Sequence, residues 1–289
     1  MTFQEIASEW LAQKEQSVKP GSLDSYRTAL ATTILPVLGE KEEIAEEDVR
    51  DFLATIQSNG VKASSFRNYV TIVRNVLRFG SERGWCQFPY WNVEVSGRGY
   101  KSERQPVLLQ PQQEKKLVEY LIGTPSPRHL GIFLALSFGL RLGETCDLQW
   151  GAIDLEKRVL NVIEGPGQLR RIPIPEAIMP ILTLCSYGKP GSAYVCTGTT
   201  EPVMSNKSLR DSLKAVSKRL DLPALIFQDL RHMFTVRCIT SGCNFITLMS
   251  LLGYSSAQNL YDEYKAFYQN DVSGAMAAQA ASLIPDEPK

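Results

Sequence analysis

Residues 135–155 read ALSFGLRLGETCDLQWGAIDL and decide how the rest of the chain is interpreted. An apolar helix is predicted to end at Gly139, a residue type that commonly terminates helices. Arg141 and Glu144 follow directly, and we expect both to be buried. An arginine that emerges from an apolar helix needs a partner for its charge. Two interpretations are open: an internal ion pair with Glu144, or a guanidinium braced to bind a phosphate through two hydrogen bonds.

Two later segments combine apolar periodicity with polar residues. They are FQDLRHMFTVRCITSG at 227–242 and LLGYSSAQNLYDEYKAF at 251–267. The first places Arg231 and His232 in the opening turns of an amphipathic helix. In the second, Gly253 closes one helix, and the next helix carries the tyrosines Tyr261, Tyr264 and Tyr268 beside the carboxylates Asp262 and Glu263. Taken alone, such tyrosines are usually packing residues, and the two carboxylates are expected to be exposed.

The first third of the chain is predicted to be helical. Helices are expected over about 2–14, 22–36, 45–57 and 64–83, the first opened by a Thr2–Glu5 capping box and the second capped by Ser22 and ended by Pro36 and Gly39. On the fourth helix, Arg67, Arg74 and Arg78 fall opposite an apolar stripe. These arginines are either a solvated face or a set of phosphate contacts, because no glutamate is interleaved with them.

A basic, glycine-rich connector separates this part from the rest. Residues 95–109 contain Arg98, Lys101 and Arg104 and little apolar content, so we expect a linker at 98–106 between domains at 1–97 and 107–289. The second domain is predicted to be mixed. Its helices are expected at about 110–122, 127–140, 176–185, 206–220, 229–241, 244–252 and 257–266, with a hairpin of strands 159–163 and 171–175.

Composition excludes several classes of protein. The chain has 289 residues, 31 basic and 31 acidic, so it lacks the strong positive charge typical of a nucleic-acid binder, although a basic face remains compatible with a neutral total. No apolar run is long enough to span a membrane, no secretion signal is expected, and a cytoplasmic location with reduced thiols is favoured. Two histidines and no CxxC pair argue against a metal site, and the absence of GxGxxG and GxxxxGK[ST] loops argues against a nucleotide cofactor.

Taken together and in this order, the three segments resemble the tyrosine recombinase (phage integrase) family. That family has the pattern GLRxSE…LxW, then a β-hairpin with a lysine, then HxLRHxF, then LGH followed nine or ten residues later by a nucleophilic tyrosine. The match here is GLRLGE with Leu148 and Trp150, QDLRHMF, and LLGY with Tyr264 ten residues after Tyr254. Three separated motifs with intact spacing make a chance match improbable.

The resemblance implies a mainly α protein with a small β-hairpin sheet. An α-helical core-binding domain at 1–97 and an α+β catalytic domain with a C-terminal tail helix at 270–283 would clamp double-stranded DNA, as a tetramer on paired sites and possibly a monomer when free. It also implies metal-free phosphoryl transfer through a 3′-phosphotyrosyl link. Tyr264 matches the nucleophile, Arg141 and Arg231 match the phosphate-binding arginines, and Glu144 would orient Arg141.

Three positions depart from the family pattern. Gln168 and Leu169 stand where the hairpin lysine, the general acid for the leaving 5′-oxygen, is expected, and glutamine cannot supply a proton. Arg170 or Arg171 could reach the site, but a guanidinium is a poor acid. Gln228 replaces the first histidine of HxLRH. Tyr254 replaces the histidine of LGH and can still donate a hydrogen bond.

The favoured function is therefore site-specific DNA recombination or integration, as in a mobile element, by a site with fewer proton-transferring side chains than the family pattern. The alternative from another class is a catalytically silent relative that binds DNA or active recombinases as an accessory protein. A type IB topoisomerase is a third candidate. Candidate DNA contacts are Arg67, Arg74 and Arg78, the linker residues Arg98 and Lys101, and Arg210, Lys214 and Lys218, which share one face of the 206–220 helix.

Overall fold

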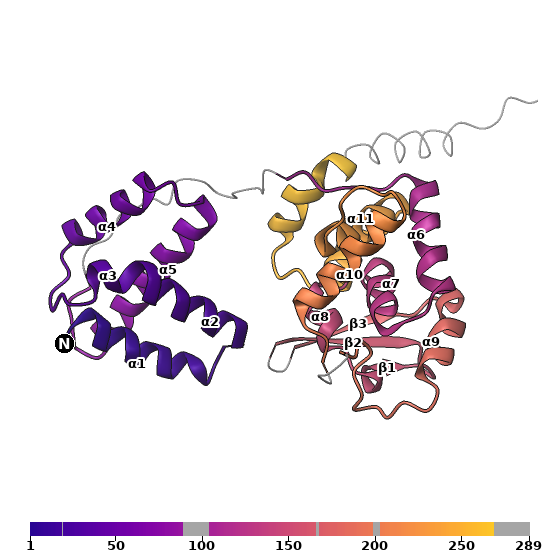
Figure 1. Cartoon of the computed structure of the whole chain (residues 1–289), viewed down its shortest axis with the longest axis horizontal. Helices are drawn as coiled ribbons and strands as arrows, with labels where there is room; N and C mark the ends of the chain where they lie inside the picture. Colours follow the sequence, from indigo (N-terminus) through magenta and orange to yellow (C-terminus); the bar gives the residue numbers. More distant parts are fainter. Residues whose placement is uncertain (19, 89–103, 166–167, 199–202, 269–289) are drawn as a thin grey trace, which may run out of the picture. The chain divides into compact units, whose positions relative to one another are not determined.

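The computed structural model describes residues 1–18, 20–88, 104–165, 168–198 and 203–268, and the chain forms two compact units, Met1–Arg104 and Gln105–Lys289 (Figure 1). The first unit contains α1 (Phe3–Glu15), α2 (Pro20–Ala29), the π-helical turn η1 (Leu30–Ile34), α3 (Leu35–Leu38), α4 (Glu46–Ser58) and α5 (Ala63–Ser81). The capping box of α1 is present, since Thr2 and Glu5 exchange side-chain and backbone hydrogen bonds. Its core joins α1, α4 and α5 through buried side chains such as Phe3, Phe52 and Val76.

The second helix differs from the sequence prediction at both ends. It begins at Pro20 rather than after Ser22, because proline is well suited to the first helical position. It also runs past Pro36 as far as Leu38. The reason is the π turn at Leu30–Ile34, where Leu35 donates its backbone N–H to the carbonyl of Leu30. A wider turn of this kind accommodates a proline that cannot donate a helical hydrogen bond.

The second unit packs helices around α7, which contacts α6, α8, α10 and α11. Its elements are α6 (Pro111–Gly123), α7 (Pro127–Phe138), α8 (Leu142–Asp147), η2 (Trp150–Ala152), β1 (Ile153–Asp154), β2 (Val159–Gly165), β3 (Gln168–Pro173), η3 (Glu176–Ile178), α9 (Met179–Ser186), α10 (Asn206–Arg219), α11 (Phe227–Thr240) and α12 (Phe245–Leu252), and residues 257–268 are also helical. Seven of the twelve residues of α7 are buried apolar side chains, which explains its central place in the core.

The three strands form one antiparallel sheet in the order β1-β2-β3 (Figure 1). Leu160 pairs with Ile172, and Val162 pairs with Arg170. Directly opposed residues share a face of an antiparallel sheet, and all four are buried. Arg170 therefore belongs to the inner face of the sheet.

The expectation of a mainly helical protein with a small antiparallel sheet is confirmed. Three details of the prediction were wrong: α8 and β1 were missed, and the hairpin strands run closer to the turn than 163 and 171. Short elements of two to six residues carry too little periodicity to be recognised. Among the described residues, no helix has both the length and the apolar character needed to cross a bilayer.

Candidate active site

Glu144 is the acceptor for two arginines. Arg141 caps α8, donating its backbone N–H to Glu144 Oε2 at 2.8 Å and its guanidinium Nη1 to Oε1 at 2.6 Å. Arg170 donates Nη1 to Oε1 at 3.2 Å and Nη2 to Oε2 at 2.9 Å. Burial alone would raise the pKa of Glu144, but the hydrogen bonds and charges of Arg170 and Arg141 outweigh it and lower that pKa to about 2. The carboxylate is therefore ionised and holds both guanidinium groups in place.

Arg141 is not buried, contrary to expectation. Its side chain is 45% exposed, whereas that of Glu144 is 9% exposed. The ion pair with Glu144 is present, and part of the guanidinium side chain is exposed as well. The two interpretations drawn from the sequence are compatible: the internal ion pair braces a group that can still contact a phosphate.

Arg231, on α11, ties two helix ends together. It donates hydrogen bonds to the carbonyl oxygens of Gly139 at 2.7 Å and Leu252 at 2.5 Å, which close α7 and α12. Arg141 donates to the neighbouring carbonyl of Gly253 at 3.2 Å. Carbonyl groups at helix C-termini lack intrahelical partners and carry partial negative charge, so they suit a guanidinium. Burial lowers the pKa of Arg231, and the nearby charge of Arg141 adds to this effect.

Gly139 is required for this arrangement. It has a φ of +64°, and a Cβ atom at this position would lie 2.5 Å from the ring of Phe234 on α11. Residues other than glycine rarely adopt this conformation, and the close approach leaves no room for a methyl group. Gly139 thus lets α7 end against α11, with its carbonyl directed at Arg231.

Tyr264 lies inside the second unit, on the helix at 257–268. It is 2% exposed, and its hydroxyl shares a hydrogen bond with Nδ1 of His232. Burial raises the pKa of Tyr264, and the charge of Glu263 raises it further. Tyr261, three residues earlier on the same helix, is 45% exposed.

Sequence reasoning missed His232 and Glu263 as members of the site. Glu263 is an exposed helix residue, as expected, and yet one oxygen accepts a hydrogen bond from Tyr254 Oη at 2.8 Å and the other lies 3.4 Å from His232 Nε2. The ring of Tyr254 in turn lies 5.5 Å from the Arg231 guanidinium. The sequence signal that could have identified them is adjacency to a motif residue: His232 directly follows Arg231, and Glu263 directly precedes Tyr264.

The hairpin brings an arginine to the site. Arg170 is buried against Glu144, whereas Leu169 is exposed and Arg171 points outward with it. Because successive side chains of β3 point to opposite faces of the sheet, Leu169 and Arg171 lie on the face away from Glu144 and are not candidates for a role in the site. Gln168 pairs with Gly165 at the start of β3, and its side chain lies outside what the structure describes. Within the described ranges, no three His, Cys, Asp or Glu side chains gather as a metal ion would require.

The family model for phage integrases matches residues 108–270, which is more than half of the chain. This chain belongs to the phage integrase family. The model of the phage integrase central domain matches residues 3–90 of the first unit. The family is thus recognised on both sides of the connector.

Individual relatives of the integrase are more distant. Tyrosine recombinase XerC of Xanthomonas campestris pv. campestris (strain B100) is 25% identical over 255 residues, covering 84% of this chain and 78% of the relative. The Tn1549 transposon integrase in complex with circular intermediate DNA superposes with a TM-score of 0.71 at 16% identity, covering 91% and 94% of the two chains. A lambda integrase dimer bound to a COC′ core site gives 0.65 at 19% identity, covering 91% and 95%. These structures share the fold of the integrase.

Gln228 and Tyr254, where the sequence is expected to depart from the family pattern, both have side chains next to this cluster. Gln228 is exposed on the first turn of α11, with its Nε2 atom 3.5 Å from His232 Nε2. Tyr254 is half-buried, and burial together with its hydrogen bond to Glu263 raises its pKa to about 12. Tyr254 therefore remains a neutral donor at physiological pH.

The candidate DNA contacts occupy exposed or half-exposed helix positions. Arg67 and Arg74 are half-exposed and Arg78 is exposed on α5, and Arg210, Lys214 and Lys218 are exposed on α10. Arg98 and Lys101 lie outside the described residues, as does the tail at 270–289.

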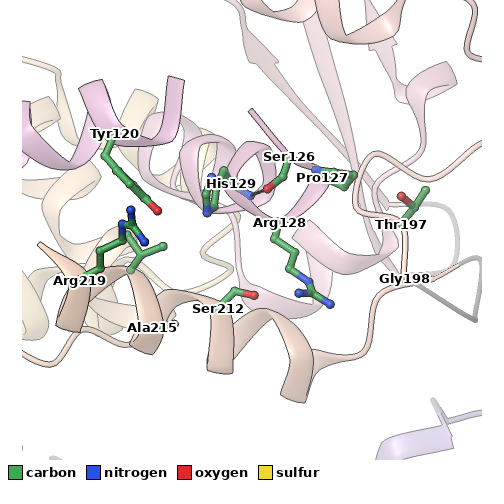
Figure 2. A pocket seen from close by; sticks show the side chains of 11 residues that line it. Tyr120, Ser126, Pro127, Arg128, His129, Thr197, Gly198, Ser212, Ala215 and Arg219 are labelled. Carbon is green, nitrogen blue, oxygen red and sulfur yellow. Dashed lines mark hydrogen bonds between the residues drawn. The ribbon is translucent and has the colours of Figure 1, made fainter. Parts of the chain in front are cut away.

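A separate pocket of about 580 Å³ lies on the other flank of α10 (Figure 2). It is lined from α6 by Tyr120, from the start of α7 by Arg128 and His129, and from α10 by Ser212 and Arg219. At about 100° per residue, Ser212 and Arg219 lie on the side of α10 opposite Lys214. The residues that line this pocket include none of the site predicted from the family motifs.

Glu144→Gln is expected to destabilise the second unit. The carboxylate contributes stability that is complete above its unfolded pKa near 4.5 and is lost as the pH falls toward 2. Removing it leaves Arg170 buried beside a neutral amide, with an expected loss of roughly 2–4 kcal/mol at pH 7. Chemical denaturation at several pH values measures this, and the difference from wild type should shrink below pH 4.5. Glu176→Gln, which removes an exposed partner of Arg158, is the control and should change stability by less than about 1 kcal/mol.

Proposed function

We propose that this integrase is a site-specific DNA recombinase that cuts and rejoins DNA through a 3′-phosphotyrosyl intermediate, with Tyr264 as the nucleophile. The observation that carries the proposal is the convergence of the three family motifs in one cluster. Arg231 contacts the ring of Tyr254, Tyr254 donates to Glu263, and Glu263 and Tyr264 are neighbours on one helix. These contacts between residues far apart in the sequence support the proposal.

In this mechanism, Arg141 and Arg231 stabilise the phosphorane. The phenol oxygen of Tyr264 attacks the scissile phosphorus, the bond to the 5′-oxygen breaks, and the energy of that bond is retained in the new ester. Two fixed guanidinium groups match the added negative charge of the equatorial oxygens. Glu144 and the carbonyls of Gly139, Leu252 and Gly253 hold both arginines in place before the substrate binds.

Tyr264 has to become accessible before it can react. Its side chain is 2% exposed in the free protein, so a DNA phosphate cannot reach its hydroxyl until the groups that cover it are displaced. Such gating by a mobile element is common in enzymes that must not react prematurely. We propose that DNA binding and assembly supply the displacement.

Double-stranded DNA and further copies of the chain are the proposed partners. Related proteins have been seen as a lambda integrase tetramer bound to a Holliday junction, with a TM-score of 0.62 to this chain. We propose that residues 1–97 form the DNA-binding domain, that 98–106 is a linker and that 107–289 is the catalytic domain. We further propose a tetramer on paired sites.

The direct test is a covalent-trapping assay. Nicked duplexes are prepared from the DNA that flanks the gene, so that cleavage releases a short oligonucleotide and religation is prevented. An active recombinase accumulates as a covalent DNA adduct that survives denaturing electrophoresis. Absence of an adduct on a duplex that the protein binds would contradict the proposal.

A catalytically silent DNA-binding relative is the second candidate. The observation that favours it is the small number of side chains that could transfer a proton. Gln228 stands where the family pattern has a histidine, and the hairpin residue that contacts Glu144 is Arg170 rather than a lysine. Losing a general acid costs about 10²–10⁴ in rate. Specific binding without any adduct would identify this alternative.

The basic residues of α5 and α10 lead to a prediction about DNA affinity. Arg78→Ala on α5 and Lys214→Ala on α10 should each weaken binding and reduce the slope of log K against log salt by about 0.9, because one phosphate contact is lost. Binding isotherms at four salt concentrations measure this slope. Lys189→Ala in the loop after α9 is the control and should leave it unchanged. An unaltered slope for Arg78→Ala would mean that the α5 stripe is only a solvated face.

A further inference from the structure

His232 lies between the nucleophile and a carboxylate. Its Nδ1 atom contacts the Tyr264 hydroxyl, and its Nε2 atom lies 3.4 Å from Glu263 Oε1. The imidazole is buried, with 8% of the residue exposed. The chain contains one other histidine, His129, which lies in the separate pocket of Figure 2.

Glu263 is held at both of its oxygens. Oε2 accepts a hydrogen bond from Tyr254 Oη at 2.8 Å, which leaves Oε1 directed at His232. Tyr254 follows α12 and precedes the 257–268 helix, so the carboxylate is fixed from outside its own helix. This contact gives the motif residue Tyr254 a role that does not require it to contact DNA.

The carboxylate selects one tautomer of His232. A neutral imidazole carries one N–H group, and its other nitrogen offers a lone pair. A carboxylate beside Nε2 favours the hydrogen on that nitrogen, because a lone pair there would face a negative oxygen. Nδ1 then presents its lone pair to the Tyr264 hydroxyl. The competing arrangement places the hydrogen on Nδ1 and lets Nε2 accept from the Gln228 amide, whose Nε2 atom lies 3.5 Å away.

Tyr264 requires a base, and its other neighbours are unsuitable. Burial raises the pKa of its phenol, so the hydroxyl does not ionise unaided. Arg231 cannot accept a proton, and the hydroxyl of Thr235, which also hydrogen-bonds the phenol, is not basic. Tyr254 already donates its hydroxyl hydrogen to Glu263. Nδ1 of His232 is a basic atom in direct contact with the phenol oxygen.

We propose that His232 is the general base that accepts the Tyr264 proton, and that Glu263 is a positioning residue that orients the imidazole and stabilises its cation. In the cleavage step the Tyr264 O–H bond breaks and an N–H bond forms at Nδ1 of His232. The phenolate lone pair forms the O–P bond, and the P–O5′ bond breaks with its electrons leaving on the 5′-oxygen, which takes a proton from water. In rejoining, the 5′-hydroxyl loses its proton to water or hydroxide, its oxygen forms the P–O5′ bond, the bond from phosphorus to the Tyr264 oxygen breaks, and the imidazolium returns its proton to the departing phenolate. This inference rests on the strand-transfer function proposed above.

The arrangement predicts a pH dependence. The charged and titratable groups around the imidazole are Glu263 and Tyr264 on the 257–268 helix, Tyr254 in the preceding turn and Arg231 on α11. Histidine is the side chain that ordinarily titrates between pH 5 and 8. The single-turnover cleavage rate should rise as His232 loses its proton and then level off. Glu263→Gln should move the midpoint to lower pH, because the imidazolium loses a neighbouring negative charge.

Single-turnover cleavage of the nicked duplex, measured from pH 5 to 9, tests the proposal. His232→Gln should slow cleavage by about 10²–10⁴-fold, and its cleavage rate should no longer rise to a plateau between pH 5 and 8. Glu263→Gln should give a smaller loss together with the shifted midpoint. His129→Gln and the exposed neighbour Asp262→Asn are the matched controls and should behave as wild type. DNA affinity should be unchanged in all four variants, since none removes a proposed DNA contact.

Nitrogen-15 NMR reads the tautomer without relying on catalysis. In the His129→Gln protein a single imidazole remains, and its shifts should show hydrogen on Nε2 and an accepting Nδ1. This measurement also covers the case in which His232→Gln does not fold. Hydrogen on Nδ1, or a His232→Gln variant that cleaves with the rate and pH profile of wild type, would overturn the proposal. If the wild type itself forms no adduct, the strand-transfer function fails first, and the base role falls with it.

Discussion

Tyr264→Phe is expected to abolish the covalent DNA adduct, and Tyr261→Phe is expected to leave it intact. The phenol of Tyr264 is held against His232 within the cluster that contains both arginines, whereas Tyr261 is exposed on the outer side of the same helix. Removing the only attacking oxygen eliminates the intermediate rather than slowing it. Trapping on a nicked duplex measures the adduct, and peptide mass spectrometry locates it.

The control for this prediction is DNA binding. Tyr264 is buried and faces no proposed DNA contact, so Tyr264→Phe should bind the duplex with the affinity of wild type. An adduct mapped to Tyr261 or Tyr268 would overturn the assignment of the nucleophile. A Tyr264→Phe variant that neither binds nor cleaves would instead report a loss of folding, which its melting curve would reveal.

The second large effect concerns the leaving group. A duplex with a bridging 5′-phosphorothiolate at the scissile bond should be cleaved about 10²–10⁴-fold faster than ordinary DNA, because a thiolate leaves without a proton donor. The reason lies in the hairpin, where Arg170 is the residue that reaches Glu144 and a guanidinium is a poor acid. Cleavage rates on the two substrates, measured under the same single-turnover conditions, give the ratio.

Lysine substitutions provide the complementary test. Gln168→Lys is expected to raise the rate on ordinary DNA and to reduce the advantage of the thiolate substrate. Leu169→Lys is the control, since Leu169 is exposed on the strand face opposite Arg170. Equal rates on the two substrates would mean that a proton donor is already in place. No adduct on a thiolate duplex that the protein binds would favour the silent DNA-binding relative.

Much of the site followed from motif spacing. The order of GLRLGE, QDLRHMF and LLGY, with Tyr264 ten residues after Tyr254, indicated the family that the match over 108–270 confirms. Spacing is informative here because residues of one motif lie on one or two turns of a helix, where local geometry determines which side chains meet. The roles assigned to individual residues remain predictions.

Contacts between motifs did not follow from spacing. Arg170 was one of several hairpin candidates until the register of β2 and β3 placed it beside Val162 on the buried face. Arg141 was expected to be buried and its side chain is 45% exposed, although it is hydrogen-bonded to both Glu144 and Gly253. The π turn before Pro36 was likewise invisible, since a single wide turn leaves the helical pattern almost unchanged.

The sequence by itself determined the mainly helical fold class, the family and the candidate nucleophile, since each depends on residue types at short, regular separations. Only the tertiary structure decided that Glu144 is shared by Arg141 and Arg170, that Arg231 joins the ends of α7 and α12, and that His232 separates Tyr264 from Glu263. These contacts join residues as many as 92 positions apart, as with Gly139 and Arg231. Which of them form depends on how the helices and the sheet pack, and packing is a property of the whole core rather than of any segment.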